Sequence, residues 1–215
     1  MKVQSILLIT ASLALATFPA GGQSAARSPQ QPPAQSPAQL TESGRILVAG
    51  HLTSYLIHRL PVSSFPDLPA AVADELDRRG CLIPQTYEAH HPENVVHASL
   101  ERTGSSDWAV LCSAQGMVSL LVFFTSASPQ SWAQPFVLAS AHDTQRLQSH
   151  DETGVLGFNW GIDPASPEQL HEAQTGLEPR PQLVDHDALA DSVIEQKTIY
   201  HFFAKKVWTL LDMPD

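Results

Sequence analysis

Apolar residues recur with a helical period in three segments of the chain. Across residues 43–60 they fall every three or four positions, and Pro61 follows, which predicts a helix that ends there. Residues 67–80 repeat this spacing; the segment begins with an aspartate that can cap a helix and ends with a glycine that can adopt the left-handed conformation. A third, shorter helix is expected at residues 166–173, where a serine precedes a proline.

Apolar runs of strand length fill much of the remaining chain. Residues 95–100, 107–112 and 117–124 follow one another through short connections that contain glycine, which predicts an antiparallel meander. In the middle run, large apolar side chains occupy both the odd and the even positions, so both faces of this strand are expected to be covered. Three more strands are expected at residues 155–162, 193–203 and 207–211. About six strands and about three helices predict an α+β domain with a mainly antiparallel sheet.

The first 26 residues have the composition of an export signal. Lys2 gives a positive start, residues 6–18 are uncharged and apolar, and small residues follow. This order is typical of a signal peptide, cut here after Gly22 or after Ala26. The alternative is a membrane anchor, but the apolar run of 13 residues is shorter than the roughly 20 that span a bilayer.

The rest of the chain divides into a tether and one domain. Residues 27–41 contain four prolines and four glutamines and are expected to form a disordered tether, because almost nothing in them can be buried. Residues 42–215 have the size of a single domain and contain no apolar stretch long enough to cross a membrane. The predicted location is therefore secreted or periplasmic.

The chain is acidic, with 12 basic and 22 acidic residues and a formal net charge of −10. Removal of the signal peptide takes away one lysine and gives 11 − 22 = −11. The only adjacent basic pairs are Arg78-Arg79 and Lys205-Lys206, whereas binding to a phosphate backbone needs clustered cations. Nucleic acid is therefore not expected as a partner, and the expected partner is a protein or a small ligand.

Two cysteines, Cys81 and Cys112, lie in the predicted domain. In an exported protein two cysteines usually pair, because the compartment is oxidising. A disulfide that closes a loop of this length stabilises a fold by about 3 to 4 kcal/mol in the chain-entropy account. The alternative is a nucleophilic thiol at Cys112, which would need a histidine positioned beside it.

Three segments carry a resemblance to other proteins. They are Gly-Cys-Leu-Ile-Pro-Gln at 80–85, Asp-Trp-Ala-Val-Leu-Cys-Ser at 107–113, and Ile-Tyr-His-Phe-Phe at 199–203 together with Trp208. With these motifs the chain resembles a group of uncharacterised exported bacterial proteins over most of residues 65–215. The resemblance implies that the two cysteines pair and that the region is one domain. It implies no activity and no catalytic residue.

Two groups of side chains have the chemistry of metal ligands. His90 and His91, with Glu88 and the nearby His97, offer imidazoles and a carboxylate of the kind that bind zinc, although adjacent histidines point apart in most backbones. The alternative is that they are solvated loop histidines.

The second group, Asp185, Asp187 and Asp191, occupies positions 1, 3 and 7 of a calcium loop. Its positions 6 and 12 are Ala190 and Gln196 instead of glycine and glutamate. The alternative is an acidic loop that caps a helix.

Neither the Gly-x-Ser-x-Gly elbow nor the His-Glu-x-x-His motif is present, and no phosphate-binding glycine loop occurs. The adjacent pairs His142-Asp143 and His150-Asp151 offer acid-base groups without a motif around them. Three aromatic residues, Trp132, Phe158 and Trp160, either form an exposed recognition patch or close one end of the sheet.

The sequence therefore predicts a non-enzymatic binding domain that needs no cofactor and recognises a protein or a small ligand. The alternative is a small secreted hydrolase or metal-dependent enzyme that uses a histidine and carboxylate site. No catalytic residue is assigned.

Overall fold

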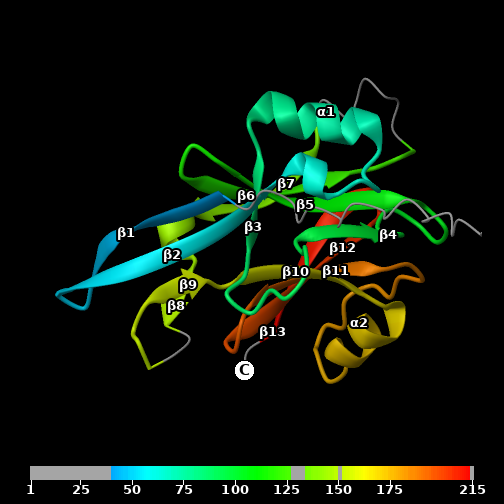
Figure 1. Ribbon diagram of the computed structural model, residues 1–215. Coiled ribbons are helices and arrows are strands. Elements are labelled where there is room, and N and C mark those ends of the chain that lie inside the picture. The colour runs from blue at the N-terminus through cyan, green and yellow to red at the C-terminus, as the bar shows by residue number, and fades with distance from the viewer. Residues whose placement is uncertain (1–39, 127–133, 150–151, 214–215) are drawn as a thin grey trace, which may run out of the picture. The chain divides into compact units, whose positions relative to one another are not determined.

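The computed structural model describes residues 40–126, 134–149 and 152–213. In these ranges the chain forms thirteen strands in two sheets and two α-helices (Figure 1). The predicted α+β class with about six strands and three helices is wrong, because the protein is mainly β. No helix in the described ranges is long and apolar enough to span a membrane.

Nine strands form the first sheet, sheet A. They are β1 (Leu40–Val48), β2 (His51–Pro61), β3 (Leu82–Gln85), β4 (Val95–Ala98), β5 (Asp107–Ala114), β6 (Met117–Phe123), β7 (Phe136–His142), β8 (Leu147–Ser149) and β9 (Leu156–Phe158). Their order is β7-β6-β5-β3-β2-β9-β8, with β1 on β2 and β4 on β5. The β2 and β9 pair is parallel, and the other pairs are antiparallel. The meander β4-β5-β6 is therefore confirmed.

Four strands form the second sheet, sheet B, in chain order. They are β10 (Trp160–Ala165), β11 (Ala188–Val193), β12 (Lys197–Ala204) and β13 (Val207–Met213). Each strand of sheet B pairs with its neighbour in the antiparallel direction. The two C-terminal strands expected from the sequence are present as β12 and β13. Strand β11 was not expected from the sequence.

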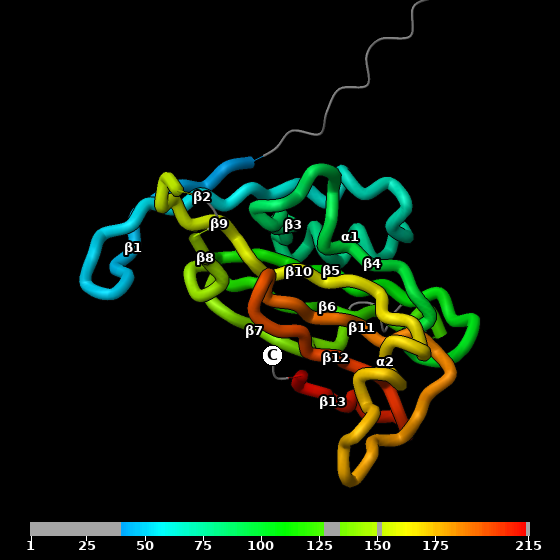
Figure 2. Tube along the Cα trace, turned by 90° about the horizontal axis from the view of Figure 1, so that it is seen from below, coloured from blue at the N-terminus to red at the C-terminus, as the bar shows by residue number. Residues whose placement is uncertain are grey.

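Three apolar clusters hold the sheets and helices in layers. The largest lies between the sheets, where Leu111 and Leu120 of sheet A pack in one cluster with Trp160 and Leu189 of sheet B. A second cluster lies on the other face of sheet A under α1 (Ala70–Arg79). A third joins α2 (Pro167–Ala173) to the outer face of sheet B; Figure 2 shows the path of α2 beside the strands of this sheet. Burial of this apolar surface is the main favourable term in folding.

Residues 43–60 form no helix; they belong to the β1-β2 hairpin. Ala49 and Gly50 both have positive φ, 47° and 85°, as in the two-residue turn that matches the twist of paired strands. The apolar residues of this segment do not share one buried face: Leu47, near the turn, is exposed, whereas Ile57 is fully buried. Strand pairing over nine residues of β1 overrode the helical pattern.

The other two helices are confirmed, with one change at a terminus. α1 starts after Pro69 with no side-chain cap, so Asp67 is not its cap, and Gly80 ends it at a φ of 71°. Within α1, a hydrogen bond from Arg78, supported by Arg79, lowers the pKa of the buried Glu75 carboxyl. In α2, the Ser166 hydroxyl accepts a hydrogen bond from the backbone N–H of Gln169, as a capping box requires.

The single strand predicted at 155–162 is wrong, because the chain passes there from one sheet to the other. β9 belongs to sheet A and β10 to sheet B, with Asn159 between them. The Asn159 N–H donates to the carbonyl of Arg146, and its own carbonyl accepts from the N–H of Ile194. The backbone of Asn159, where the chain passes between the sheets, is therefore hydrogen-bonded through both its N–H and its carbonyl group.

Cys81 and Cys112 form a disulfide with a Cα to Cα distance of 5.0 Å. The bond joins Cys81, just after the glycine that ends α1, to Cys112 on β5 in the middle of sheet A. Both cysteines lie in the cluster under the helix. The predicted pairing is confirmed. The alternative of a nucleophilic thiol at Cys112 is wrong, since its sulfur is bonded.

Candidate functional site

A groove of about 520 Å³ lies where the segment before α1 meets β4 and β5. Its lining is mostly apolar and includes three polar side chains, Ser64, Asp67 and His97. The lining residues are Ser64, Phe65, Pro66, Asp67, Leu68, Pro92, Val95, His97 and Trp108. This volume accommodates a small ligand or the side chains of a bound segment.

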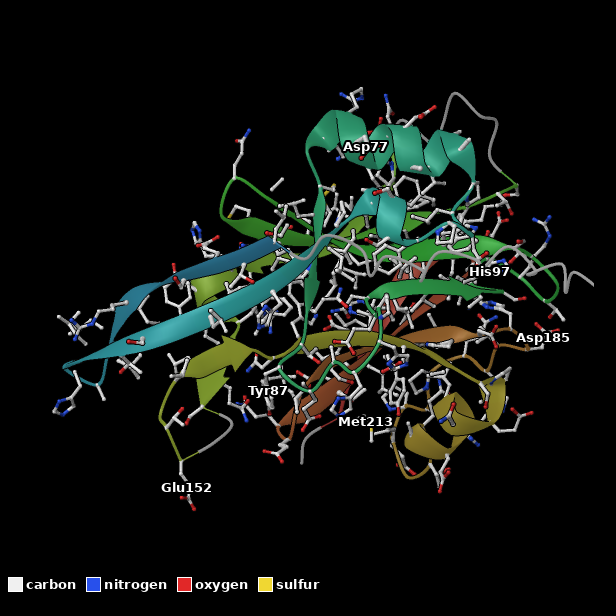
Figure 3. The ribbon with its side chains drawn as sticks, in the orientation of Figure 1. Asp77, Tyr87, His97, Glu152, Asp185 and Met213 are labelled. Carbon is white, nitrogen blue, oxygen red and sulfur yellow. A yellow bond between two sulfur atoms is a disulfide. The ribbon has the colours of Figure 1, made fainter. Side chains whose placement is uncertain are left out.

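The floor of this groove, the His97 groove, is a stacked pair of rings. His97 on β4 and Trp108 on β5 are directly opposite in the antiparallel register, where side chains are near neighbours. Their ring centroids are 4.4 Å apart and their planes differ by 10°. Trp108 is buried, whereas His97, which is labelled in Figure 3, is exposed. One face of the imidazole therefore rests on the indole and the rest of the ring meets solvent.

The imidazole is also held by a hydroxyl. His97 Nε2 lies 2.6 Å from Ser106 Oγ, the residue before β5. The pair has the spacing of a serine and its general base. In the described ranges no carboxylate bonds to Nδ1 of His97, so the ring is oriented by Trp108 and Ser106 alone. The arrangement lacks the third group that orients the base in a catalytic triad.

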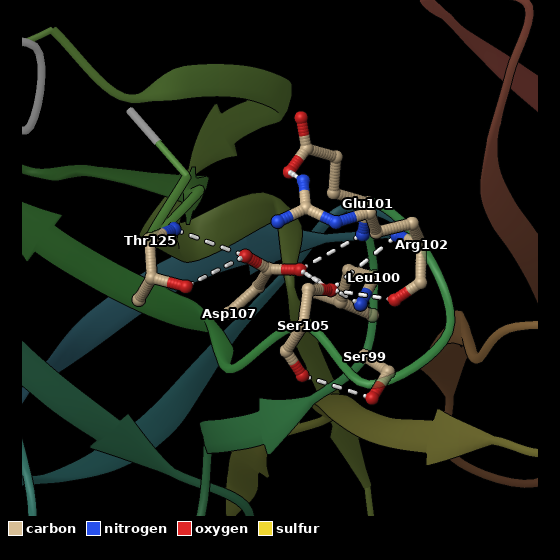
Figure 4. A network of polar contacts seen from close by, with 7 residues as sticks. All are labelled: Ser99, Leu100, Glu101, Arg102, Ser105, Asp107 and Thr125. Carbon is tan, nitrogen blue, oxygen red and sulfur yellow. Dashed lines mark hydrogen bonds and ion pairs between the residues drawn. The ribbon is translucent and has the colours of Figure 1, made fainter. Parts of the chain in front are cut away.

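A fully buried carboxylate places both partners of His97. Asp107 stands between Ser106 and Trp108, and its exposed fraction is 0%. Its Oδ2 accepts hydrogen bonds from the N–H groups of Leu100 and Glu101, at 3.0 and 2.8 Å (Figure 4).

The same carboxylate accepts two further hydrogen bonds. Oδ2 also accepts from the Ser105 hydroxyl, and Oδ1 accepts from the N–H of Thr125 at 3.0 Å. Charge-assisted bonds of this kind compensate for the loss of water around a buried charge. Asp107 thus ties the 99–106 loop and the end of β6 to the start of β5.

The histidines proposed as zinc ligands are not gathered at one point. His90 and His91 are exposed in the loop before β4, and His97 is engaged with Ser106 and Trp108. Among the residues that the structure describes, no three His, Cys, Asp or Glu side chains are placed to hold a metal ion.

The three aspartates of the calcium hypothesis are also dispersed. Asp185 is exposed, and Asp187 accepts a hydrogen bond from the N–H of Ser99 at 2.9 Å. Asp191 is buried and accepts from the Trp160 indole and from His201 Nε2, the latter at 3.0 Å. Each carboxylate therefore has a separate environment. Those of Asp187 and Asp191 accept hydrogen bonds from other parts of the fold.

The remaining candidates are structural or lie outside the described ranges. Asp143 is buried and bonds to Arg59 and to the Ser113 hydroxyl, so it orders sheet A instead of pairing with its neighbour His142. Phe158 and Trp160 are buried between the sheets. Of the two aromatic interpretations, the exposed patch is therefore wrong for these residues. Residues His150, Asp151 and Trp132 lie outside the described ranges.

Comparisons with protein-family models, with curated proteins and with solved structures found no match. The resemblance to exported bacterial proteins stays a prediction, and the assignment of function depends on the geometry of this chain.

We expect Asp107→Asn to lower the free energy of unfolding by about 2 to 4 kcal/mol. The substitution replaces one buried carboxylate oxygen, which accepts hydrogen bonds, with an amide NH2 group that faces N–H donors. Urea unfolding followed by circular dichroism measures this. Asp163→Asn, an exposed position on β10, is the matched control and should change the value by less than about 0.5 kcal/mol. Equal effects at the two positions would contradict the role given to Asp107.

Proposed function

We propose that this chain is a secreted or periplasmic binding domain that takes its ligand in the His97 groove. The disulfide supports this location, because such bonds persist in oxidising compartments. The ligand is a protein segment or a small molecule, as the sequence predicts. The observation that carries the proposal is the exposed imidazole stacked on a buried indole inside an apolar groove.

The lining indicates what the ligand carries. Phe65, Leu68 and Val95 present apolar surface, which favours an apolar or aromatic group. The outward face of His97 offers a second stacking surface, continuing the pair that it forms with Trp108. Asp67 is exposed at the rim, and the whole chain has a net charge of −10. A ligand with a planar apolar group and a cationic group is therefore the best fit.

Phenethylammonium is a suitable probe, with phenylacetate as its counterpart of opposite charge. We expect amide shifts around His97 and Trp108 to saturate with phenethylammonium and to be weaker by about tenfold with phenylacetate. Asp67→Asn should remove most of that difference. His97→Ala should abolish saturation, because the stacking surface is lost.

His51→Ala is the matched control, since His51 is exposed in the β1-β2 hairpin away from the groove. It should bind the probe as the unaltered protein does. Absence of saturable shifts with either probe, or equal loss in both histidine variants, would contradict the proposed site.

The 2.6 Å contact between Ser106 and His97 supports a second candidate, a small secreted hydrolase. In this candidate His97 takes the proton of the Ser106 hydroxyl, and the serine oxygen attacks an acyl carbonyl. The bond to the alcohol or amine breaks as His97 gives that leaving group the proton, and water then hydrolyses the acyl-serine. A metal-dependent enzyme has less support, because no metal-ligand cluster occurs in the described part of the chain.

A fluorophosphonate probe separates the two candidates, since it labels only an activated serine. A binding domain should remain unlabelled, as judged by intact mass. Labelling that disappears in Ser106→Ala and in His97→Ala would replace the binding proposal with the hydrolase.

A further inference from the structure

A second pocket, of about 390 Å³, lies apart from the His97 groove. Three segments form it: the start of the 99–106 loop, the loop before β11, and the turn between β12 and β13. Their polar side chains are Glu101, Arg102, Gln182, Asp185, His186, Lys205 and Lys206. We name it the Lys205 pocket.

The walls of the Lys205 pocket are fixed to one another. The Thr103 hydroxyl donates to the carbonyl of Asp185 at 2.8 Å, which joins the first two segments. His186 is buried, and its Nε2 lies 3.0 Å from the carbonyl of Phe203, which joins the loop to β12. The pocket is therefore largely preformed, as small-ligand sites usually are.

Positive charge gathers in this pocket although the chain is acidic. Lys205 and Lys206 are exposed, and neither has an ion-pair partner among the described residues. Arg102 is partly compensated, since its Nη1 lies 2.7 Å from Glu101. Asp185 is the opposing charge, exposed and without an ion pair in the same ranges. The lining thus carries three cations and two carboxylates, and Arg102 and Glu101 among them are paired with each other.

The backbone of the turn indicates that its lysines serve a purpose other than turning the chain. Three two-residue hairpin turns occur in the described part, and in each both residues have positive φ. The turns at 49–50 and 115–116 place glycine second, where that conformation is free of Cβ strain. The third places Lys205 and Lys206 at φ of 50° and 67°. Lys206 therefore occupies the position that is glycine in the other two turns, and its positive φ carries a Cβ strain that glycine would avoid.

We infer that the Lys205 pocket binds the phosphate or sulfate group of a small molecule. Lysine ammonium groups bind tetrahedral oxyanions as point charges, and Arg102 supplies further N–H donors at the wall. Leu183 and Val184 line the same pocket and give apolar contact to the body of the ligand. The inference does not depend on the function proposed for the His97 groove.

The test is a titration of the full chain, labelled with ¹⁵N, with inorganic phosphate and separately with inorganic sulfate. Sodium chloride keeps the ionic strength constant, so screening does not change. Saturable shifts are expected at residues 101–103, 183–186 and 203–206. Saturation by only one anion identifies which group the ligand carries.

Four variants make the result specific. Lys205→Gln and Lys206→Gln should each weaken binding by about tenfold, whereas Lys197→Gln, a control on β12 paired with Asp212, should not. Asp185→Asn should tighten binding, because it removes the opposing charge.

The double variant Lys205→Asn with Lys206→Gly should abolish binding and raise the unfolding midpoint, because the turn then has its preferred residues. Shifts that never saturate, equal binding by the Lys205→Gln and Lys197→Gln variants, or a lowered midpoint in the double variant would overturn the inference.

Discussion

Strand β5 is the constraint on which the rest of the structure depends, because it is buried on both faces. Residues 107–113 are all buried, so alternate side chains must find different partners. Leu111 packs in the cluster between the sheets, while Val110 and Cys112 pack in the cluster under α1. One strand therefore supports two cores, and the disulfide at Cys112 fixes α1 to the second of them.

Because β5 is buried throughout, the polar residues at its two ends need internal partners. At its start Asp107 accepts bonds from two neighbouring segments, the 99–106 loop and the residues that follow β6. At its other end the Ser113 hydroxyl accepts from Arg59 and donates to Asp143. The His97 groove follows from the first of these arrangements, since Ser106 and Trp108 flank Asp107. The fold thus positions the candidate site through a structural carboxylate that takes no part in binding.

The sequence predicted features that depend on neighbouring residues and missed those that depend on distant ones. The meander, α2 and the disulfide pairing were confirmed because period, capping and compartment are local or compositional signals. Residues 43–60 and 155–162 were misassigned because strand pairing, and passage between sheets, are set by tertiary contacts. His97 was singled out only as a metal ligand, because its stacking on Trp108 appears only in the register of β4 and β5. Asp107 was missed as an organiser, although an aspartate opening an apolar run is a visible signal.

Amide hydrogen exchange of the native protein tests the central place of β5 most directly, because exchange rates rank segments by their opening free energy. The account predicts that the amides of Val110 and Leu111 exchange last, together with those of their partners in β6. The hairpin end at residues 51–54, which pairs only with β1, should exchange first. Exchange of the β5 amides as fast as those of this hairpin end would contradict the account.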